Sequence, residues 1–487
     1  MAWENWEIAR DSTFMPVVQY ESDLSKTTEI SRFLSDCQRS AVRQKEAKIA
    51  SLSFSISPIA PWNVLAALGQ SNQRHFYYDP PDQMSIVGIQ SVVDCCAAGR
   101  DRFNQAQSFV QRWQARFIHE SFVDKTFSSP TARPAASTRH FLCSTTFFEK
   151  TTTRFEPVCV FVPQIQVITC PNHSTVIFNF LVTAETDLDQ AASSISQQLW
   201  HLESAQSTGF ESALAQRQVS RTVDGFDLAV SAVLKQMNQQ GLHKVVLADV
   251  MDVVAEEPFD QVRSLQTLRQ NHPDCTVFSI GNGRGQSFIG ASPERLLSIR
   301  DGQITTDALA GSAPRGATPS VDIQLAQTLL NSAKERYEHR VVVDFLLAQL
   351  RSLGLAPHYT GDPQLLRLFH IQHLHTPISA ALNAHDISPL EVLNKLHPTP
   401  AVAGVPRQQA CKLIRQQETF DRGPYAAPLG WIDTQGNSEF IVGIRSALLD
   451  GRNARLYAGA GIVAGSRPDK ELAEIKLKLQ TLLNALS

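Results

Sequence analysis

Strand-like and helix-like segments alternate along this chain, and the order of that alternation limits the fold more than any other feature of the sequence. VCVFVPQIQVI (158–168) and TVIFNFLVTA (175–184) have the composition of strands, and KVVLADV (244–250) that of a short buried strand. A helical pattern lies between Ile195 and Met237. Because the segments follow no regular strand–helix–strand rhythm, they favour a mixed α+β fold with antiparallel sheets over a dinucleotide-binding unit.

The second half of the chain predicts a hairpin, helices and further strands. CTVFSIGNGRGQSFIGAS (275–292) predicts two strands around a glycine-rich turn. A phosphate-binding loop is the alternative there, but the spacing is not GxGxxG and no helical pattern opens behind it. Apolar residues at three- and four-residue spacing predict helices over 320–352 and 466–485. Between them, EFIVGIRSALL (439–449) and ARLYAGAGIV (454–463) are expected to be paired strands.

Composition and charge exclude several classes of protein. The 487 residues include 44 basic and 47 acidic ones, for a net charge of −3, and no long basic run. Nucleic acid and anionic membranes are therefore not expected as partners. The N-terminus MAWENWEIARDSTF has no apolar stretch typical of a signal peptide, and the most apolar runs are broken well short of a membrane span. We expect a soluble cytoplasmic protein, and by length alone two or three domains.

The eight cysteines are scattered through the chain without CxxC pairing. In a chain of this length the pattern predicts reduced, mostly buried thiols and neither a disulfide framework nor a zinc site.

Two stretches predict irregular structure. The segment from Asp124 to His140 (DKTFSSPTARPAASTRH) is rich in Ser, Thr, Pro, Ala and Arg, which predicts an exposed loop. In LHPTPAVAG (396–404) two prolines one residue apart cannot continue a helix, and the small residues behind them supply no bulky group for a core. The stretch alone predicts a rigid turn with a surface histidine.

Two of the predicted helices each carry a pair of carboxylates on one face. Glu335 and Glu338 are three residues apart in KERYEHR, and Glu471 and Glu474 repeat that spacing in PDKELAEIKLK. Lys478 lies one turn beyond Glu474. Together the two pairs could form an oxygen-rich cage for Mg²⁺, although such pairs usually lie on solvated helix faces.

Three further side chains have more than one interpretation. Lys244 opens an apolar strand, where a lysine usually extends to water, but beside a cavity burial would lower its pKa and suit it to act as a base. Glu294 follows a proline at a strand end and could either cap a helix or, in a pocket, serve as a general acid. Arg445 could clamp a carboxylate from its strand. The backbone N–H groups of AGAG (458–461) and LAGSAPRG (309–316) could cradle an anion.

Taken together, these segments resemble the chorismate-utilising enzymes and, within them, the isochorismate synthases. The resemblance covers about residues 220–487 and rests on these motifs: KVVLA, GASPERLL, LAGSAPRG, SAKERYEHRVVVD, QHLHT, LHPTPAVAG, FDRGPYAAPLGW, EFIVGIRSALL and LYAGAGIVAGSRPDKELAEIKLK. It implies one large unit of antiparallel sheets packed face to face with helices outside. Residues 1–215 would be a variable N-terminal portion packed into that unit, and residues 216–487 the chorismate-binding catalytic region.

The resemblance also implies a role for each site residue. Lys244 would activate water for attack at C2 of chorismate, and Glu294 would protonate the departing C4 hydroxyl. Glu338 and Glu474 would bind Mg²⁺ directly, with Glu335 and Glu471 holding the waters of the metal. The positions implied to contact the substrate are Gly311, Ser312, His397, Ala401, Tyr425, Arg445, Gly459, Gly461 and Lys478. Among these, Arg445 and Tyr425 would hold the enolpyruvyl carboxylate with help from the backbone of Gly459 and Gly461, and Lys478 would complete the anionic site.

Three positions bear on which member of the family the chain resembles. Ala401 stands where salicylate synthases and the aminating relatives usually have Thr. Ser312 stands where Thr is more common, and keeps the hydroxyl. Asp249 replaces the usual Arg after the base strand and so removes a positive charge. Salicylate synthase, an aminating synthase and a non-catalytic binding protein remain alternatives. No Gly-x-Cys-x-Gly amidotransferase elbow is present, and no obligatory glutaminase subunit is expected.

Overall fold

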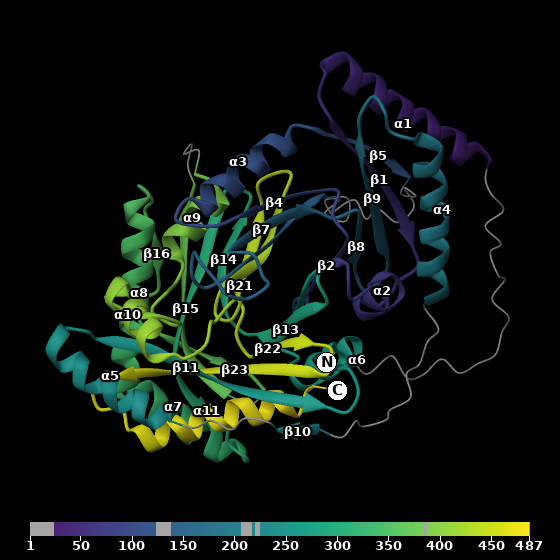
Figure 1. Ribbon diagram of the computed structural model, residues 1–487. Coiled ribbons are helices and arrows are strands. Elements are labelled where there is room, and N and C mark those ends of the chain that lie inside the picture. The colour runs from purple at the N-terminus through teal and green to yellow at the C-terminus, as the bar shows by residue number, and fades with distance from the viewer. Residues whose placement is uncertain are drawn as a thin grey trace.

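Two large sheets form the frame of the protein. The computed structural model describes residues 24–122, 138–205, 217–219, 225–369, 371–382 and 387–486, and Figure 1 shows these two sheets with helices outside them. Within this range all paired strands are antiparallel except β1 (Lys48–Ile56) and β5 (Phe117–Phe122). The expected α+β fold with large antiparallel sheets is confirmed.

The first sheet has 13 strands in the described residues. Their order is β10 (Arg217–Val219), β11 (Lys244–Ala255), β23 (Asn453–Val463), β22 (Ser446–Asp450), β13 (Gln286–Ser292), β12 (Thr276–Asn282), β2 (Arg74–Asp79), β3 (Ser85–Ile89), β8 (Ile165–Thr169), β9 (Ser174–Val182), β1 and β5, with β19 (Gly404–Val405) beside β11.

The second sheet has ten strands within the described ranges. Their order is β16 (His358–Tyr359), β18 (Ile371–Ala381), β15 (Gln303–Pro314), β14 (Arg295–Arg300), β21 (Ser438–Val442), β20 (Pro428–Asp433), β6 (His140–Thr145), β7 (Val158–Val162) and β4 (Val93–Ala97), with β17 (Gln364–Arg367) beside β18.

Helices cover the outer faces of both sheets. α5 and α11 pack on β11 and β23, α7 and α8 on β15, and α1 and α4 on the β1–β9 side (Figure 1). The described helices are α1 (Leu24–Gln44), α2 (Pro61–Leu68), α3 (Arg102–Gln114), α4 (Leu188–Ser204), α5 (Phe226–Gln240), α6 (Gln261–Asn271), α7 (Pro319–Asn331), α8 (Ala333–Ser352), α9 (Pro389–Leu396), α10 (Arg407–Gln417) and α11 (Pro468–Leu483). Among them none combines the length and apolar character needed to cross a bilayer.

Strands from the two halves of the chain pair with each other in both sheets. In the first sheet β2 pairs with β12, and Tyr78 lies opposite Phe278. In the second β6 pairs with β20, and Leu142 lies opposite Trp431. The proposed division at residue 215 stays a prediction, but the first 205 residues contribute strands to the same sheets. The predicted loop at 124–140 falls largely on residues 123–137, outside the described residues.

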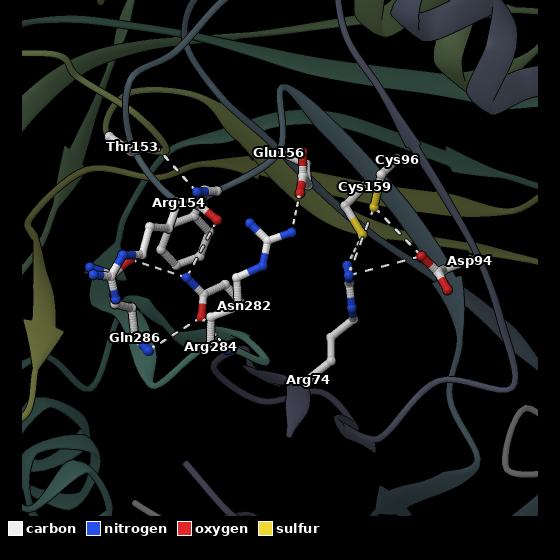
Figure 2. Close-up of polar contacts among 11 residues, drawn as sticks. Arg74, Asp94, Cys96, Thr153, Arg154, Glu156, Cys159, Asn282, Arg284 and Gln286 are labelled. Atoms are coloured by element: carbon white, nitrogen blue, oxygen red, sulfur yellow. Dashed lines mark hydrogen bonds and ion pairs between the residues drawn. The ribbon is translucent and has the colours of Figure 1, made fainter. Parts of the chain in front are cut away.

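The glycine-rich stretch at 281–285 is a hairpin turn, as the sequence predicts. Gly283 and Gly285 have φ angles of +73° and +86°, which favour glycine. The Asn282 Oδ1 atom accepts hydrogen bonds from the backbone N–H groups of Arg284 (2.8 Å) and Gln286 (3.2 Å), and these side chains are drawn in Figure 2. Arg284 is paired with Glu156 at 2.9 Å. These glycines therefore serve the turn between β12 and β13.

Several predicted elements are divided in the structure. The stretch 158–168 forms β7 of the second sheet and β8 of the first. The stretch 439–449 forms β21 and β22, which belong to different sheets, so only its second half pairs with β23 as expected. The chain changes sheets at residues 443–445, where Arg445 has a φ of +49°. The predicted helix 320–352 is likewise α7 and α8, because the Ser332 hydroxyl accepts a hydrogen bond from Glu335 N and begins a new helix there.

Candidate active site

A cavity of about 170 Å³ lies between β11 and β23 of the first sheet and β15 of the second. Most of the residues predicted for the site contribute to its wall: Lys244, Glu294, Gly311, Ser312, Glu338, Ala401, Arg445, Gly459, Gly461, Glu474 and Lys478. The wall also includes His373, to which the sequence assigns no role, and Tyr457. The side chains come from strands, from helices α8 and α11, and from the points where the chain passes between sheets.

Lys244 begins β11 at the floor of the cavity and is only 1% exposed. Its Nζ lies 2.6 Å from Glu338 Oε1 of helix α8. This close ion pair replaces the water that a strand-end lysine usually reaches. The structure thus rules out the solvated interpretation of Lys244 and places its ammonium group in the cavity.

Glu294 lies where the chain leaves β13 of the first sheet and enters β14 of the second. A strand follows it, so it does not cap a helix. Burial raises the pKa of Glu294 to about 7, with Lys244 opposing that rise and Asp307 adding to it. A carboxyl group with a pKa of about 7 is about half protonated at neutral pH, so it can donate a proton there.

Arg445 lies at another passage between sheets, where the chain goes from β21 to β22, and not within a strand as the sequence predicts. Its guanidinium Nη1 is 3.6 Å from Cys275 Sγ. Lys478 of α11 also lines the cavity, and its Nζ is 2.6 Å from Glu474 Oε1 and 2.8 Å from the Gly459 carbonyl oxygen. With Lys244, three cationic side chains therefore line the wall of the cavity, a suitable environment for an anionic ligand.

Gly459 and Gly461 lie within strand β23, paired with Ala248 and Val246 of β11, and not in a loop. A Cβ atom at Gly461 would lie 2.9 Å from Glu338 Oε1, and one at Gly459 would lie 2.7 Å from the Tyr425 hydroxyl. The two glycines therefore leave room for side chains that enter the site from either side.

Tyr425 is buried and does not itself line the cavity. Its ring stacks on that of Tyr457 at a centroid distance of 5.1 Å, and Tyr457 is part of the cavity wall. Contact between Tyr425 and a ligand stays a prediction.

The glycine at position 311 forms a bulge in β15. Its φ is +78°, and the pairing with β18 shifts register between Ala310 and Ser312. The Ser312 hydroxyl is 2.8 Å from His373 Nδ1, and both residues line the cavity. The buried His373 Nε2 has no hydrogen-bond partner among the described residues. The QHLHT motif was the available sequence signal for this histidine.

The loop at 396–404 brings Ala401 to the cavity wall but turns His397 away from it. The His397 Nε2 atom is 2.9 Å from the Phe147 carbonyl oxygen, and burial lowers the pKa of His397 to about 3. The histidine is therefore neither on the surface nor beside the cavity. It fastens the loop to a segment of the N-terminal half, and contact between His397 and a ligand stays a prediction.

Arg422, which the sequence did not single out, is 1% exposed and joins several parts of the site. Its guanidinium pairs with Glu418 at 2.6 Å and donates to the carbonyl oxygens of Val402 (2.8 Å) and Val246 (2.9 Å). Glu418 in turn accepts from Ala248 N at 2.9 Å. The ion pair thus connects the loop that carries Ala401 to the strand that carries Lys244.

Asp249, the departure from the usual Arg, is buried one residue beyond Ala248. Its carboxylate accepts a hydrogen bond from Val250 N at 2.7 Å, and its charge contributes to raising the pKa of Glu418. It does not line the cavity.

The four predicted metal-binding glutamates gather near one another without converging on a common point. Glu338 and Glu474 raise the pKa values of Glu335 and Glu471, in addition to the effect of burial. Lys334 offsets part of this negative charge, because its Nζ lies 3.9 Å from an oxygen of Glu335 and 3.9 Å from an oxygen of Glu471. Across the described ranges, no three acidic, histidine or cysteine side chains are arranged to hold a metal ion. The oxygen donors suit Mg²⁺ chemically, so the metal stays a proposal.

The chain is similar in sequence to known isochorismate synthases. The chain is 43% identical over 266 residues to the salicylate biosynthesis isochorismate synthase of Pseudomonas aeruginosa and 38% identical over 258 residues to the isochorismate synthase MenF of Bacillus subtilis. The first match covers 54% of this chain and the second 53%, and the chain spans about half the length of these relatives, 54% of each.

The fold comparison extends over more of the chain. The structure of MenF, the menaquinone-specific isochorismate synthase from Escherichia coli, superposes with a TM-score of 0.74 at 25% identity, covering 93% of this chain and 99% of the other. The family model described as chorismate binding enzyme matches residues 32–487. With a match over nearly its whole length and a cavity built from the predicted residues, the chain belongs to the chorismate binding enzyme family.

Proposed function

We propose that this protein is a Mg²⁺-dependent isochorismate synthase, an isomerase that adds water at C2 of chorismate and removes the hydroxyl at C4. One observation carries the proposal: Lys244 and Glu294, both buried, face the same small cavity as the cations Arg445 and Lys478. The names of the relatives support the same reaction.

The two buried groups divide the proton transfers of this reaction. Moving a hydroxyl from C4 to C2 requires one proton to leave the attacking water and one to reach the departing oxygen. Lys244 would accept the first. Glu294 would donate the second, because its pKa of about 7 keeps much of it protonated at neutral pH.

The cations would hold the substrate in place for these transfers. Chorismate carries two carboxylates, and Arg445 offers a planar donor pair for one of them while Lys478 adds a second charge. Glu338 and Glu474, with help from Glu335 and Glu471, would hold Mg²⁺, which would supply positive charge to neutralise a substrate carboxylate. Binding of the metal would require Glu338 and Glu474 to release their lysines.

Ala401 favours isochorismate as the final product. Its methyl group lines the cavity where the salicylate-forming and aminating relatives usually have a threonine hydroxyl. For the pathway, we propose the menaquinone or phylloquinone branch, in line with the menaquinone-specific neighbour. Salicylate synthase and an aminating synthase are the alternative functions.

The reaction can be tested by incubating the protein with chorismate and Mg²⁺, without ammonia, and separating the products by chromatography. We expect isochorismate as the product, and no turnover after chelation of the metal. Salicylate with pyruvate, or a strict need for ammonia, would identify one of the alternatives and overturn the proposal.

Two variants assign the roles within the site. Lys244→Ala and Glu294→Gln should each lower kcat by ~10³-fold or more, since each removes one of the required proton transfers. Circular dichroism and the thermal midpoint serve as controls for folding. Near-normal turnover in either variant would refute the role assigned to that residue.

A further inference from the structure

A pair of cysteines lies far from the cavity, between the edge of one sheet and the other sheet. Cys96 of β4 and Cys159 of β7 are directly opposite in the antiparallel pairing. Directly opposite residues in such a pair have Cα atoms about 4.5–5.5 Å apart, within the range that a disulfide spans. The described strand order ends at β4, so the pair is at the edge of the second sheet.

The two thiols differ in exposure. Cys96 is exposed and Cys159 is buried. Neither residue lines the proposed active site. An exposed sulfur can meet a dissolved oxidant, while a buried sulfur beside it is available for an intramolecular reaction.

A guanidinium from the other sheet lies against both sulfurs. Arg74 of β2 donates from Nη1 to Cys159 Sγ, and its Nη2 is 3.8 Å from Cys96 Sγ. Figure 2 shows the Arg74 side chain directed at the two sulfurs and at Asp94. The Asp94 carboxylate accepts a hydrogen bond from Cys96 at 3.6 Å and lies 3.9 Å from Arg74. The positive charge favours a thiolate, which the carboxylate partly opposes.

The ionisation of the pair follows this arrangement. A hydrogen bond from Cys159, with Arg74 in support, lowers the pKa of Cys96, and the same contact raises the pKa of Cys159. The neighbouring Cys95 behaves differently, because burial raises its pKa. The exposure of Cys96 and its lowered pKa both suit it to be the sulfur that first meets an oxidant, with Cys159 as its buried partner.

We propose that Cys96 and Cys159 form an oxidisable dithiol that peroxide converts to a disulfide. The Cys96 thiolate attacks one oxygen of hydrogen peroxide, so that an S–O bond forms, the O–O bond breaks and hydroxide leaves. Cys159 then attacks the Cys96 sulfur, an S–S bond forms, and the sulfenic hydroxyl leaves with the Cys159 proton as water. The two sulfurs together lose two electrons, which reduce one peroxide to two waters. A small dithiol returns the electrons and protons.

Disulfide formation would change the contact between the sheets. It removes the thiolate from beside Arg74, a residue of the first sheet, and crosslinks β4 to β7 in the second. The proposal does not rest on the chorismate reaction, since it concerns a different part of the molecule.

The test is a mass-spectrometric measurement on the full-length chain. Reduced protein is treated with stoichiometric hydrogen peroxide, free thiols are blocked with N-ethylmaleimide, and the digest is examined without reduction. Cys95→Ser is the matched background, because Cys95 would otherwise share a peptide with Cys96. We expect a Cys96–Cys159 crosslink in both the unaltered chain and Cys95→Ser, reversed by dithiothreitol.

Three variants separate the roles. Cys96→Ser should abolish the crosslink, and Cys159→Ser should leave a sulfenic acid at Cys96 that dimedone traps. Arg74→Gln should slow alkylation of Cys96 at neutral pH by roughly 3–10-fold, since the thiolate loses its neighbouring charge. Absence of the crosslink in folded protein, or a crosslink that uses Cys95 in place of Cys96, would overturn the proposal.

Discussion

At the scale of single residues, the absence of one methyl group determines where the Lys244 ammonium can lie. Gly461 of β23 leaves the space in which Glu338 Oε1 and Lys244 Cε meet: a Cβ there would lie 2.9 Å from the first and 3.3 Å from the second. Neither neighbour has room to retreat freely, because Lys244 is buried and paired. The missing side chain of Gly461 therefore leaves the space that the Lys244–Glu338 ion pair occupies.

We predict that Gly461→Ala lowers kcat by about 10–100-fold, equivalent to ~1.4–2.7 kcal/mol, because the Lys244–Glu338 pair is displaced. The variant should still fold, with a stability loss of about 1–3 kcal/mol in urea unfolding. Gly361→Ala is the control, since nothing lies within 4 Å of a Cβ at that position. Equal activity of the two variants would contradict the steric role.

Glu294, the proposed general acid, gives a pH prediction of definite sign. If its protonated form donates the proton, kcat/KM falls as the pH rises through about 7, the pKa that burial gives it. Asp307 contributes to that raised pKa and does not line the cavity. Asp307→Asn should therefore move the falling limb of the pH profile to lower pH.

The control for this shift is Asp344→Asn, which removes an exposed carboxylate from helix α8. Its profile should match that of the unaltered chain. If the falling limb of the kcat/KM profile stays at the same pH in Asp307→Asn, the observed pH dependence does not come from Glu294.

At the scale of elements, a buried ion pair holds the Ala401 loop against strand β11. Glu418 and Arg422 are four residues apart, but their other partners, Val402, Val246 and Ala248, are distant in sequence. The four-residue spacing alone predicts an exposed ion pair that contributes little to stability. In the folded protein the Glu418–Arg422 pair is buried, so each charge needs the other to offset its loss of solvation.

Arg422→Met should destabilise the protein by about 3–5 kcal/mol, because Glu418 is left buried without its partner. The double variant Glu418→Gln with Arg422→Met should lose less than the sum of the two single losses. Urea unfolding of all four proteins measures this difference. Strict additivity would show that the two residues do not act as a pair.

At the scale of the whole molecule, the N-terminal half completes both sheets while the cavity wall comes from residues 244–478 of the described chain. Strand β12 has β2 as one neighbour, and β20 has β6. Removal of the first half would expose long edges on both sheets.

A fragment of residues 225–486 should therefore fail to fold as a stable monomer. We expect aggregation, or a thermal scan without a cooperative transition, where the full chain melts cooperatively. A soluble fragment with a sharp transition would show instead that the catalytic region is an independent domain.

Sequence reasoning succeeded where the signal is local. The strand at 175–184 and the hairpin at 275–292 follow from short motifs and periodicity. The set of residues that forms the cavity wall was implied by the resemblance to the chorismate-utilising enzymes. It failed at residues 443–445, because both flanking segments are rich in β-forming residues and only long-range pairing assigns them to different sheets. The burial of Arg422 was missed for the same reason, since its carbonyl partners lie 20 and 176 residues away.

The passages between sheets at Glu294 and at Arg445 have a consequence for inhibitor design. Glu294 and Arg445 stand on neighbouring segments joined by backbone hydrogen bonds, from Val442 N to Glu294 O (3.0 Å) and from Ala291 N to Arg445 O (3.1 Å). The main chain therefore holds these two segments together. A rigid compound could present a carboxylate to Arg445 and a hydrogen-bond acceptor to Glu294 at the matching separation. Such a compound avoids the entropy that a flexible compound loses on binding.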